Sequence, residues 1–314
     1  MVNADAFEKL RGIEAHLRSR IRGQDHFLPR VAASLIRGEM GLASPDRPRG
    51  SYLFVGPTGT GKTEVALCFS DYLFGRGQVH RFDLSEYQNQ SSVEKMIGAD
   101  RTDRGLLGRA LSGAERGTLL FDEIEKAHPL VLDLFLQMLD AARITLATGE
   151  TKSLSGYYLV FTSNVGAAEA MRMERSSFAS IETAVLRRVS QNLRPELVGR
   201  MDEKLVFARL TPDVQREICA LMVAREVARL GRSGFDLDVT REAMEFLLRE
   251  GFDRYLGARP LRHAVESHLQ DAVVRSLFAT GTGCGTVTLD SSSRRLVIVA
   301  RGEHSDVHSH NRVA

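Results

Sequence analysis

The stretch FVGPTGTGKTE (Phe54–Glu64) places three glycines and a lysine at a spacing that calls for a physical explanation. Gly56, Gly61, Lys62 and Thr63 satisfy the pattern G-x-x-x-x-G-K-[ST]. An apolar run, SYLFV, precedes the pattern, and a segment with helical periodicity follows it. A strand before and a helix after are the context in which this pattern is a phosphate-binding P-loop.

Each part of the pattern has a physical role at a phosphate. Glycines let successive backbone N–H groups turn toward the anion, and the helix that begins there directs the positive end of its dipole at it. We expect Lys62 to neutralise β- and γ-phosphate oxygens and the Thr63 hydroxyl to ligate magnesium. The sequence thus predicts a loop that binds ATP and Mg²⁺, formed by Gly56, Pro57, Thr58, Gly59, Thr60, Gly61, Lys62, Thr63 and Glu64.

A second apolar run ends in two acidic residues, in the segment TLLFDEIEKAH. We expect Asp122 to belong to the magnesium shell and Glu123 to polarise the attacking water. Adjacent acids at a strand end can also be simple surface residues, and it is the P-loop elsewhere in the chain that favours the chemical interpretation.

The fold class follows from alternation along the first two thirds of the chain. Short apolar runs alternate with helical patterns at 63–74 and 129–142. Such alternation predicts an α/β domain with a parallel sheet covered by helices. The predicted strands are 51–55, 80–84, 118–122, 157–162 and 203–207.

The pattern changes near Thr211, and a second, smaller domain is predicted. Its capped helical segments are followed by GTVTLDSSSRRLVIVA, which is typical of two short strands around a serine-rich turn. The polar tail could bind a metal through His304, His308 and His310, but a frayed terminus is the simpler interpretation. We therefore expect a large nucleotide-binding domain at 1–208, a mainly helical domain with a short β-hairpin at 209–301, and a disordered tail at 302–314.

The composition of the chain bears on its partners and on its cellular compartment. The chain has 314 residues, and 42 basic against 40 acidic side chains give no overall attraction to nucleic acid or membrane. Cys68, Cys219 and Cys284 lack the spacing of a metal or redox site, which favours a reducing compartment. No segment reaches the roughly 20 apolar residues of a membrane helix, so we expect a cytoplasmic protein without membrane insertion.

These motifs together resemble the AAA+ ATPases of the Clp unfoldase and disaggregase family, specifically the C-terminal ATPase module of ClpA and ClpB. The resemblance runs from about Leu17 to Arg301. It implies a Rossmann-like large domain, a helical lid and a homo-oligomeric ring, usually a hexamer, with ATP between subunits. IRGQD resembles the segment that frames the adenine, at Ile21 and Arg22.

Three further motifs assign roles by the same resemblance. FTSNVG resembles sensor 1, which places Asn164 near the γ-phosphate. LRPELVGRMDE resembles the segment whose arginine reaches a neighbouring subunit's nucleotide, which points to Arg200, and GARPLR resembles sensor 2, which points to Arg259. Taken alone, Asn164 could cap a helix, and either arginine could form a surface ion pair.

The chain also departs from the family pattern. Clp unfoldases carry an aromatic residue in a loop that faces the axial channel, whereas GADRTDRGLLGRAL at this position is shorter and has none. About twenty residues before IRGQD are too few for an amino-terminal substrate domain, a first ATPase ring or a middle domain, so we expect none of them. The segment after sensor 1, GAAEAMRMERSSFASIETAV, lacks the short apolar tripeptide that docks on a peptidase, which disfavours a protease partner.

Three functions remain open at this point. The first is remodelling of a specific protein partner, and the second is a non-threading conformational switch or assembly factor. The third is a nucleic-acid motor, favoured only by Arg101 and Arg104. We expect Asp100 and Asp103 to neutralise those two arginines, which disfavours nucleic acid as a partner.

Overall fold

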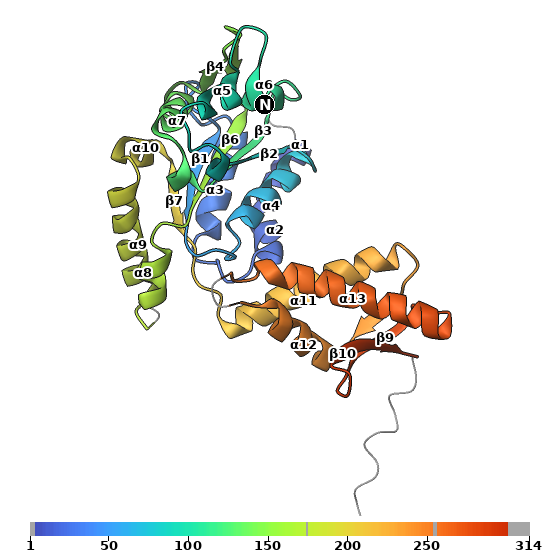
Figure 1. The fold of residues 1–314 in the computed structure, drawn as a ribbon. Coiled ribbons are helices and arrows are strands. Elements are labelled where there is room, and N and C mark those ends of the chain that lie inside the picture. Colours follow the sequence, from blue (N-terminus) through green and yellow to red (C-terminus); the bar gives the residue numbers. More distant parts are fainter. Residues whose placement is uncertain (1–3, 174, 254–255, 301–314) are drawn as a thin grey trace, which may run out of the picture. The chain divides into compact units, whose positions relative to one another are not determined.

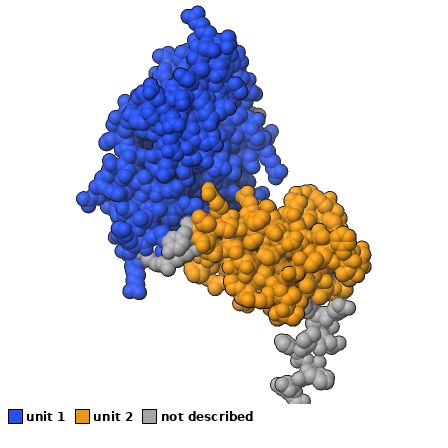
Figure 2. Space-filling view, in the orientation of Figure 1, with its two compact units in different colours: residues 1–209 blue, residues 210–314 orange. Residues whose placement is uncertain are grey.

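The computed structural model describes residues 4–173, 175–253 and 256–300, which divide into two compact units between Arg209 and Leu210 (Figure 2). The first unit is built on a five-stranded sheet in the order β2-β3-β6-β1-β7 (Figure 1). All four pairings are parallel, which confirms the predicted sheet. The strands are β1 (Gly50–Val55), β2 (Val79–Asp83), β3 (Gly117–Asp122), β6 (Tyr157–Ser163) and β7 (Glu203–Val206).

Burial on both faces explains why the central strands are continuously apolar. Every residue of β1, β3 and β6 is buried, as expected for a parallel sheet covered by helices. Leu53 and Val55 of β1 pack into one hydrophobic cluster, whereas Tyr52 and Phe54 pack into the other. This alternation is the two-residue period of a strand whose two faces both meet apolar layers.

Helices supply those two layers. One face carries α2 (Ile13–Arg20), α3 (Leu28–Glu39) and α4 (Lys62–Phe74), and the other carries α7 (Pro129–Ala141) and α9 (Phe178–Asn192). The remaining elements of the unit are α1 (Ala4–Arg11), η1 (Leu84–Glu86), α5 (Ser92–Ile97), α6 (Gly105–Ala110), η2 (Ile124–Lys126), β4 (Arg143–Thr145), β5 (Thr151–Ser153), α8 (Ala167–Arg172) and α10 (Pro195–Arg200). The β4–β5 hairpin was not predicted, because its strands have only three residues each.

The second unit has a helical core and a small sheet. Its helices are α11 (Pro212–Gly231), α12 (Arg241–Gly251) and α13 (Arg259–Thr280). The predicted hairpin consists of β9 (Gly285–Asp290) and β10 (Arg295–Val299), and β8 (Leu237–Val239) adds a parallel third strand that the sequence did not indicate. The predicted tail and its three histidines lie outside the described residues. In the described part of the chain, no helix combines the length and apolarity needed to cross a membrane.

Candidate nucleotide-binding site

Parallel pairing gathers the predicted site at one edge of the sheet. Strands β3, β6 and β1 are neighbours, and Val55 of β1 pairs with Ser163 of β6. The carboxyl ends of these three strands therefore meet at the same edge, which is where ligands bind in open α/β sheets. The P-loop follows β1, the acidic pair ends β3, and Asn164 directly follows β6.

The P-loop backbone requires its glycines. Gly56, Gly59 and Gly61 have φ values of 148°, 72° and 102°, a region that side chains with a Cβ rarely adopt. A Cβ at Gly56 would also lie 2.9 Å from the carbonyl oxygen of Phe207. Gly61 immediately precedes α4, so the loop ends at a helix N-terminus with its N–H groups and positive dipole end.

Lys62 lies inside the site, with only 8% of its surface exposed. Its ammonium donates to the carbonyl oxygens of Gly56 at 2.6 Å and Pro57 at 2.9 Å, and to Oδ1 of Asn164 at 2.9 Å. These three acceptors are neutral oxygens at the carboxyl ends of β1 and β6. A buried cation with such partners is well placed for phosphate oxygens, which attract it more strongly than neutral groups do.

Asp122 is fixed at the end of β3 from two sides. Its Oδ1 accepts a hydrogen bond from the Thr162 hydroxyl at 2.8 Å, and its Oδ2 lies 2.5 Å from Nε of Arg81. Asp122 is only 5% exposed. Each carboxylate oxygen retains a further lone pair for a metal-bound water or an ion.

These donors fit a magnesium ion held partly by substrate. Mg²⁺ typically takes one or two carboxylates together with phosphates and water. In the described part of the chain, no three His, Cys, Asp or Glu side chains group as a metal site. Asp122, the Thr63 position at the start of α4 and phosphate oxygens match that requirement.

Glu123 has a backbone that ordinary residues avoid. Its φ of 59° and ψ of 53° lie in the left-handed region, which costs a non-glycine residue roughly 1–2 kcal/mol. Its N–H donates to the Thr162 hydroxyl at 3.2 Å, and its Oε1 accepts from Nδ2 of Asn164 at 3.3 Å. The strained turn directs this carboxylate at Asn164, as expected where strain serves a site.

Asn164 thus connects the segments that follow β1 and β3. Through its amide it accepts from Lys62 and donates to Glu123. Its own backbone N–H donates to Oε1 of Glu125 at 3.0 Å, so the turn after β6 is also held. The arrangement differs from a helix cap, since both amide atoms face residues of the site.

The predicted adenine segment contacts the P-loop through a residue that the sequence did not single out. Gln24 is fully buried and donates to the carbonyl oxygens of Thr60 at 3.3 Å and Ala208 at 3.0 Å. Ile21 is 5% exposed, and Arg22 turns back to the preceding helix α2, where it donates to the carbonyl oxygen of Arg18. The segment IRGQD therefore lies beside the P-loop and the chain after β7.

Arg200 lies far from the P-loop of its own chain. It ends α10, and Glu203 of β7 pairs with Tyr52 near the start of β1, whereas the P-loop follows the other end of β1. A six-residue strand spans roughly 20 Å, which an arginine side chain cannot bridge. Arg200 instead forms an ion pair with Asp140, with Nε 2.5 Å from Oδ1.

Arg259 belongs to the other compact unit. It is the exposed first residue of α13, and its backbone N–H donates to the carbonyl oxygen of Leu256 at 3.3 Å. The segment GARPLR thus forms the start of α13. The approach of Arg259 to a phosphate stays a prediction.

Comparison with known proteins gives this geometry a family. Residues 47–204 match the model of the AAA domain (Cdc48 subfamily), and residues 210–285 match the C-terminal, D2-small domain, of ClpB protein. The chain belongs to the AAA+ ATPases of the Clp family. The resemblance inferred from the motifs is therefore confirmed.

Relatives and solved structures agree with this membership. The chain is 35% identical to chloroplastic ClpC2 of Oryza sativa subsp. japonica over 321 residues, which cover 96% of this chain and 35% of the relative. It is also 35% identical to ClpB 1 of Thermosynechococcus vestitus, covering 88% of this chain and 33% of that one. The S. cerevisiae Hsp104-ADP complex superposes with a TM-score of 0.84 at 29% identity, covering 94% of this chain and 53% of Hsp104. The chain spans about a third of the length of these curated relatives.

In this AAA+ ATPase, the loop without an aromatic residue is a compact turn between α5 and α6. Oδ1 of Asp100 accepts from the backbone N–H and the hydroxyl of Thr102, both at 2.7 Å. Asp103 accepts from the N–H of Gly105 at 3.0 Å and forms an ion pair with Arg109 at 3.2 Å. These hydrogen bonds hold the pKa of both aspartates below its usual value.

The pairing expected from the sequence for this loop was wrong. Asp100 and Asp103 bond within the turn and to Arg109, while Nε of Arg104 lies 3.6 Å from Glu150 of the β4–β5 connection. Local Asx-type turns compete successfully for the aspartates because their donors lie within three residues. Only the three-dimensional structure brings Glu150 close to this loop.

Sequence reasoning missed Thr162, Glu125, Arg81 and Gln24. Thr162 could have been found, because it is a hydroxyl at the carboxyl end of a buried strand beside Asn164. Glu125 follows the acidic pair by two residues, but its bond to the turn after β6 depends on strand order. Arg81 and Gln24 carry no local signal, because their partners belong to other elements of the fold. Arg81 of β2 pairs with Asp122 of β3, and Gln24 bonds to Ala208 after β7.

Proposed function

We propose that the chain binds ATP and Mg²⁺ at the carboxyl edge of its parallel sheet and hydrolyses the terminal phosphate. The observation that carries this proposal is the convergence of Lys62, Glu123 and Asn164, from three sequence segments, into one hydrogen-bonded group. Such convergence provides a cation for phosphate, a base for water and an amide to orient it, which phosphoryl transfer requires.

Each residue then has a defined part in the reaction. Lys62 and the N–H groups that begin α4 bind phosphate oxygens, and Thr63 and Asp122 hold the metal. Mg²⁺, when bound, would neutralise charge on the phosphates. Glu123 takes the proton of the attacking water, and the Asn164 amide fixes the position of that carboxylate.

The position of Arg200 supports hydrolysis in an assembly. Because this residue lies at the sheet edge opposite to its own P-loop, its guanidinium can stabilise a γ-phosphate only in a neighbouring subunit. We propose a homo-oligomeric ring, a hexamer by analogy with the family, in which Arg200 is an arginine finger and Arg259 couples the second unit to the nucleotide. Arginine fingers contribute on the order of 10³- to 10⁵-fold in rate.

The work of this ATPase is proposed to be remodelling of one specific protein partner. The loop at 98–104 lacks an aromatic side chain, and its aspartates are engaged in local turns, so it offers little contact area to an arbitrary polypeptide. The same observation keeps a non-threading switch or assembly factor as the second candidate. A peptidase partner and nucleic acid are not part of this proposal, and a reducing, cytoplasmic setting accords with three free cysteines.

An ATP-locked pull-down tests the proposal. Glu123→Gln should retain ATP and hold its partner, so a stoichiometric protein should co-purify in the presence of ATP and be lost with Lys62→Ala. Measured phosphate release should rise with protein concentration and fall in Arg200→Ala while nucleotide binding survives. Concentration-independent hydrolysis by a monomer would contradict the ring, and stimulation by single-stranded DNA would contradict a protein substrate.

A further inference from the structure

The guanidinium of Arg200 is held at one side by its own chain. Nε lies 2.5 and 2.6 Å from the two carboxylate oxygens of Asp140, and Nη1 donates to the carbonyl oxygen of Glu196 at 2.9 Å. Within the described residues, Nη2 makes no hydrogen bond. The side chain is 34% exposed, so part of the guanidinium group can meet a group outside the chain.

The fold places Asp140 where the finger residue needs it. Helix α7 follows the carboxyl end of β3 and returns along the sheet, so its last turn, which contains Asp140, lies near the amino ends of the strands (Figure 1). Arg200 ends α10 at the same edge. The ion pair is therefore a consequence of topology and joins residues 60 positions apart in the sequence.

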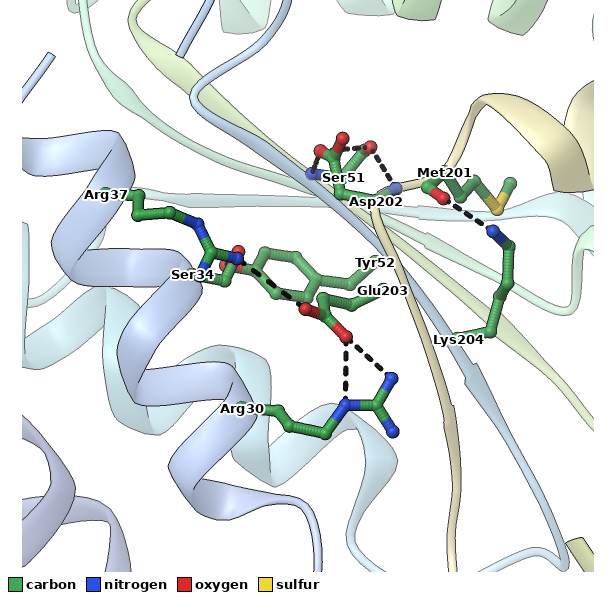
Figure 3. Close-up of polar contacts among 9 residues, drawn as sticks. All are labelled: Arg30, Ser34, Arg37, Ser51, Tyr52, Met201, Asp202, Glu203 and Lys204. Carbon is green, nitrogen blue, oxygen red and sulfur yellow. Dashed lines mark hydrogen bonds and ion pairs between the residues drawn. The ribbon is translucent and has the colours of Figure 1, made fainter. Parts of the chain in front are cut away.

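The backbone behind Arg200 is fixed to β1. Asp202 accepts from the N–H of Ser51 at 2.8 Å and from its hydroxyl at 2.7 Å, and the N–H of Asp202 donates to Oγ of Ser51 at 3.0 Å (Figure 3). Arg47 adds a bond to the carbonyl oxygen of Arg200 at 3.0 Å. Ser51 is only 1% exposed and belongs to the strand that leads into the P-loop.

Glu203, which follows Asp202, attaches the same segment of chain to α3. Glu203 accepts from Arg30 at 2.7 Å, and Arg37 lies 3.7 Å from its other oxygen, both from α3 (Figure 3). Glu203 has 14% of its side chain exposed. The chain from Arg200 to β7 is thus joined to strand β1 and to helix α3.

We propose that Asp140 and Ser51 are positioning residues for the arginine finger. Asp140 restrains the guanidinium through Nε, and Ser51 fixes the backbone of Arg200 through Asp202. An arginine side chain carries much rotamer freedom, and restraining it before the neighbour arrives reduces the ordering cost in the assembled site. The inference rests on the proposed role of Arg200 in a neighbouring subunit.

Two substitutions test the inference through turnover. Asp140→Ala and Ser51→Ala should each lower kcat at saturating ATP on the order of 10- to 100-fold, the loss expected when a reacting group is misplaced by about 1 Å. Nucleotide affinity should stay unchanged, because both residues lie at the edge opposite to the P-loop. Asp140→Asn keeps an oxygen acceptor and should lose less activity than Asp140→Ala.

Asp133 provides a matched control on the same helix. It lies two turns before Asp140 and forms an ion pair with Arg194 at 2.5 Å, with similar exposure of the arginine, 33% against 34%. Asp133→Ala removes an equivalent bond between α7 and the chain near α10 without touching Arg200. Its turnover should equal that of the wild type.

Mixed assemblies distinguish a finger effect from damage to the chain's own site. When Asp140→Ala or Ser51→Ala chains are mixed with Glu123→Gln chains, activity should return, because intact fingers then meet intact bases. Mixing with Glu123→Gln/Arg200→Ala chains should restore nothing. If Ser51→Ala does not fold, Asp202→Asn tests the same attachment.

The possible outcomes separate the two proposals. Wild-type turnover in Arg200→Ala would refute the finger itself and therefore the proposed ring chemistry. Loss and rescue in Arg200→Ala, with Asp140→Ala and Ser51→Ala behaving as Asp133→Ala, would refute only the positioning role. Loss in these two variants without rescue on mixing would also refute it, because they would then act on their own nucleotide site.

Discussion

Replacing Glu123 by glutamine should separate nucleotide binding from hydrolysis. The glutamine side chain has the same length, and its oxygen can still accept from Nδ2 of Asn164, which lies 3.3 Å from Oε1 of Glu123. If Glu123 is the general base, as proposed, the variant loses only the ability to take a proton from water. General base catalysis contributes typically 10²- to 10⁴-fold, so kcat should fall by that factor, or about 2.7–5.4 kcal/mol of barrier.

Stability should change much less than activity. Glu123 is partly exposed, and its substitution removes one negative charge from a group that includes Asp122 and Glu125. Substitutions that create no cavity and leave no orphaned group change stability by roughly 0.5 kcal/mol or less. For a unit of this size, that corresponds to a Tm shift of about 1–2 °C.

Three measurements check this prediction. Phosphate release gives kcat, a fluorescent ATP analogue gives Kd, and thermal unfolding gives Tm. Glu94→Gln, an exposed substitution of the same type on α5, serves as the control and should match the wild type in all three. Turnover by Glu123→Gln within two-fold of the wild type would refute the assignment of the base, and loss of ATP binding would refute the preserved geometry.

Three further predictions concern the P-loop, the second unit and the loop without an aromatic residue. Gly56→Ala should cost about 1–3 kcal/mol of unfolding free energy because of its positive φ, and Gly113→Ala, which has open space, should cost little in urea unfolding. Hydrogen bonds from Ser293 and Ser292 lower the pKa of Asp290 to about 2. The contribution of the Asp290 carboxylate to the free energy of unfolding is therefore complete above the ordinary pKa of 3.8 and is lost as pH falls toward 2. The urea midpoint of Asp290→Asn should accordingly lie below that of the wild type at pH 7 and converge with it near pH 2. The wild-type chain should not unfold a stable fluorescent reporter with an unstructured tail; unfolding that Leu106→Ala reduces would show that this leucine supplies the missing grip.

The sequence by itself determined the elements and the type of chemistry. Five short runs that alternate with helical patterns predicted the parallel sheet, and the three central ones are mostly apolar because β1, β3 and β6 are buried on both faces. The P-loop spacing indicated phosphate binding, since glycines with positive φ, a lysine and a helix N-terminus must be consecutive to surround one anion. Both signals are local, and local signals can be seen without a fold.

Only the tertiary structure decided which distant residues act together. The contacts of Asn164 with Lys62 and Glu123 depend on β6 lying between β3 and β1, an order that periodicity does not encode. The pairing of Arg200 with Asp140 depends in the same way on where α7 and α10 end. Short strands such as β8 escaped prediction because three residues carry too little periodicity, and the partners of the aspartates at 98–104 were decided by competition between nearby donors and a distant glutamate. Hydrogen bonds and ion pairs act only over a few ångströms, so residues far apart in sequence become partners only after strand order and helix direction have brought them within that range.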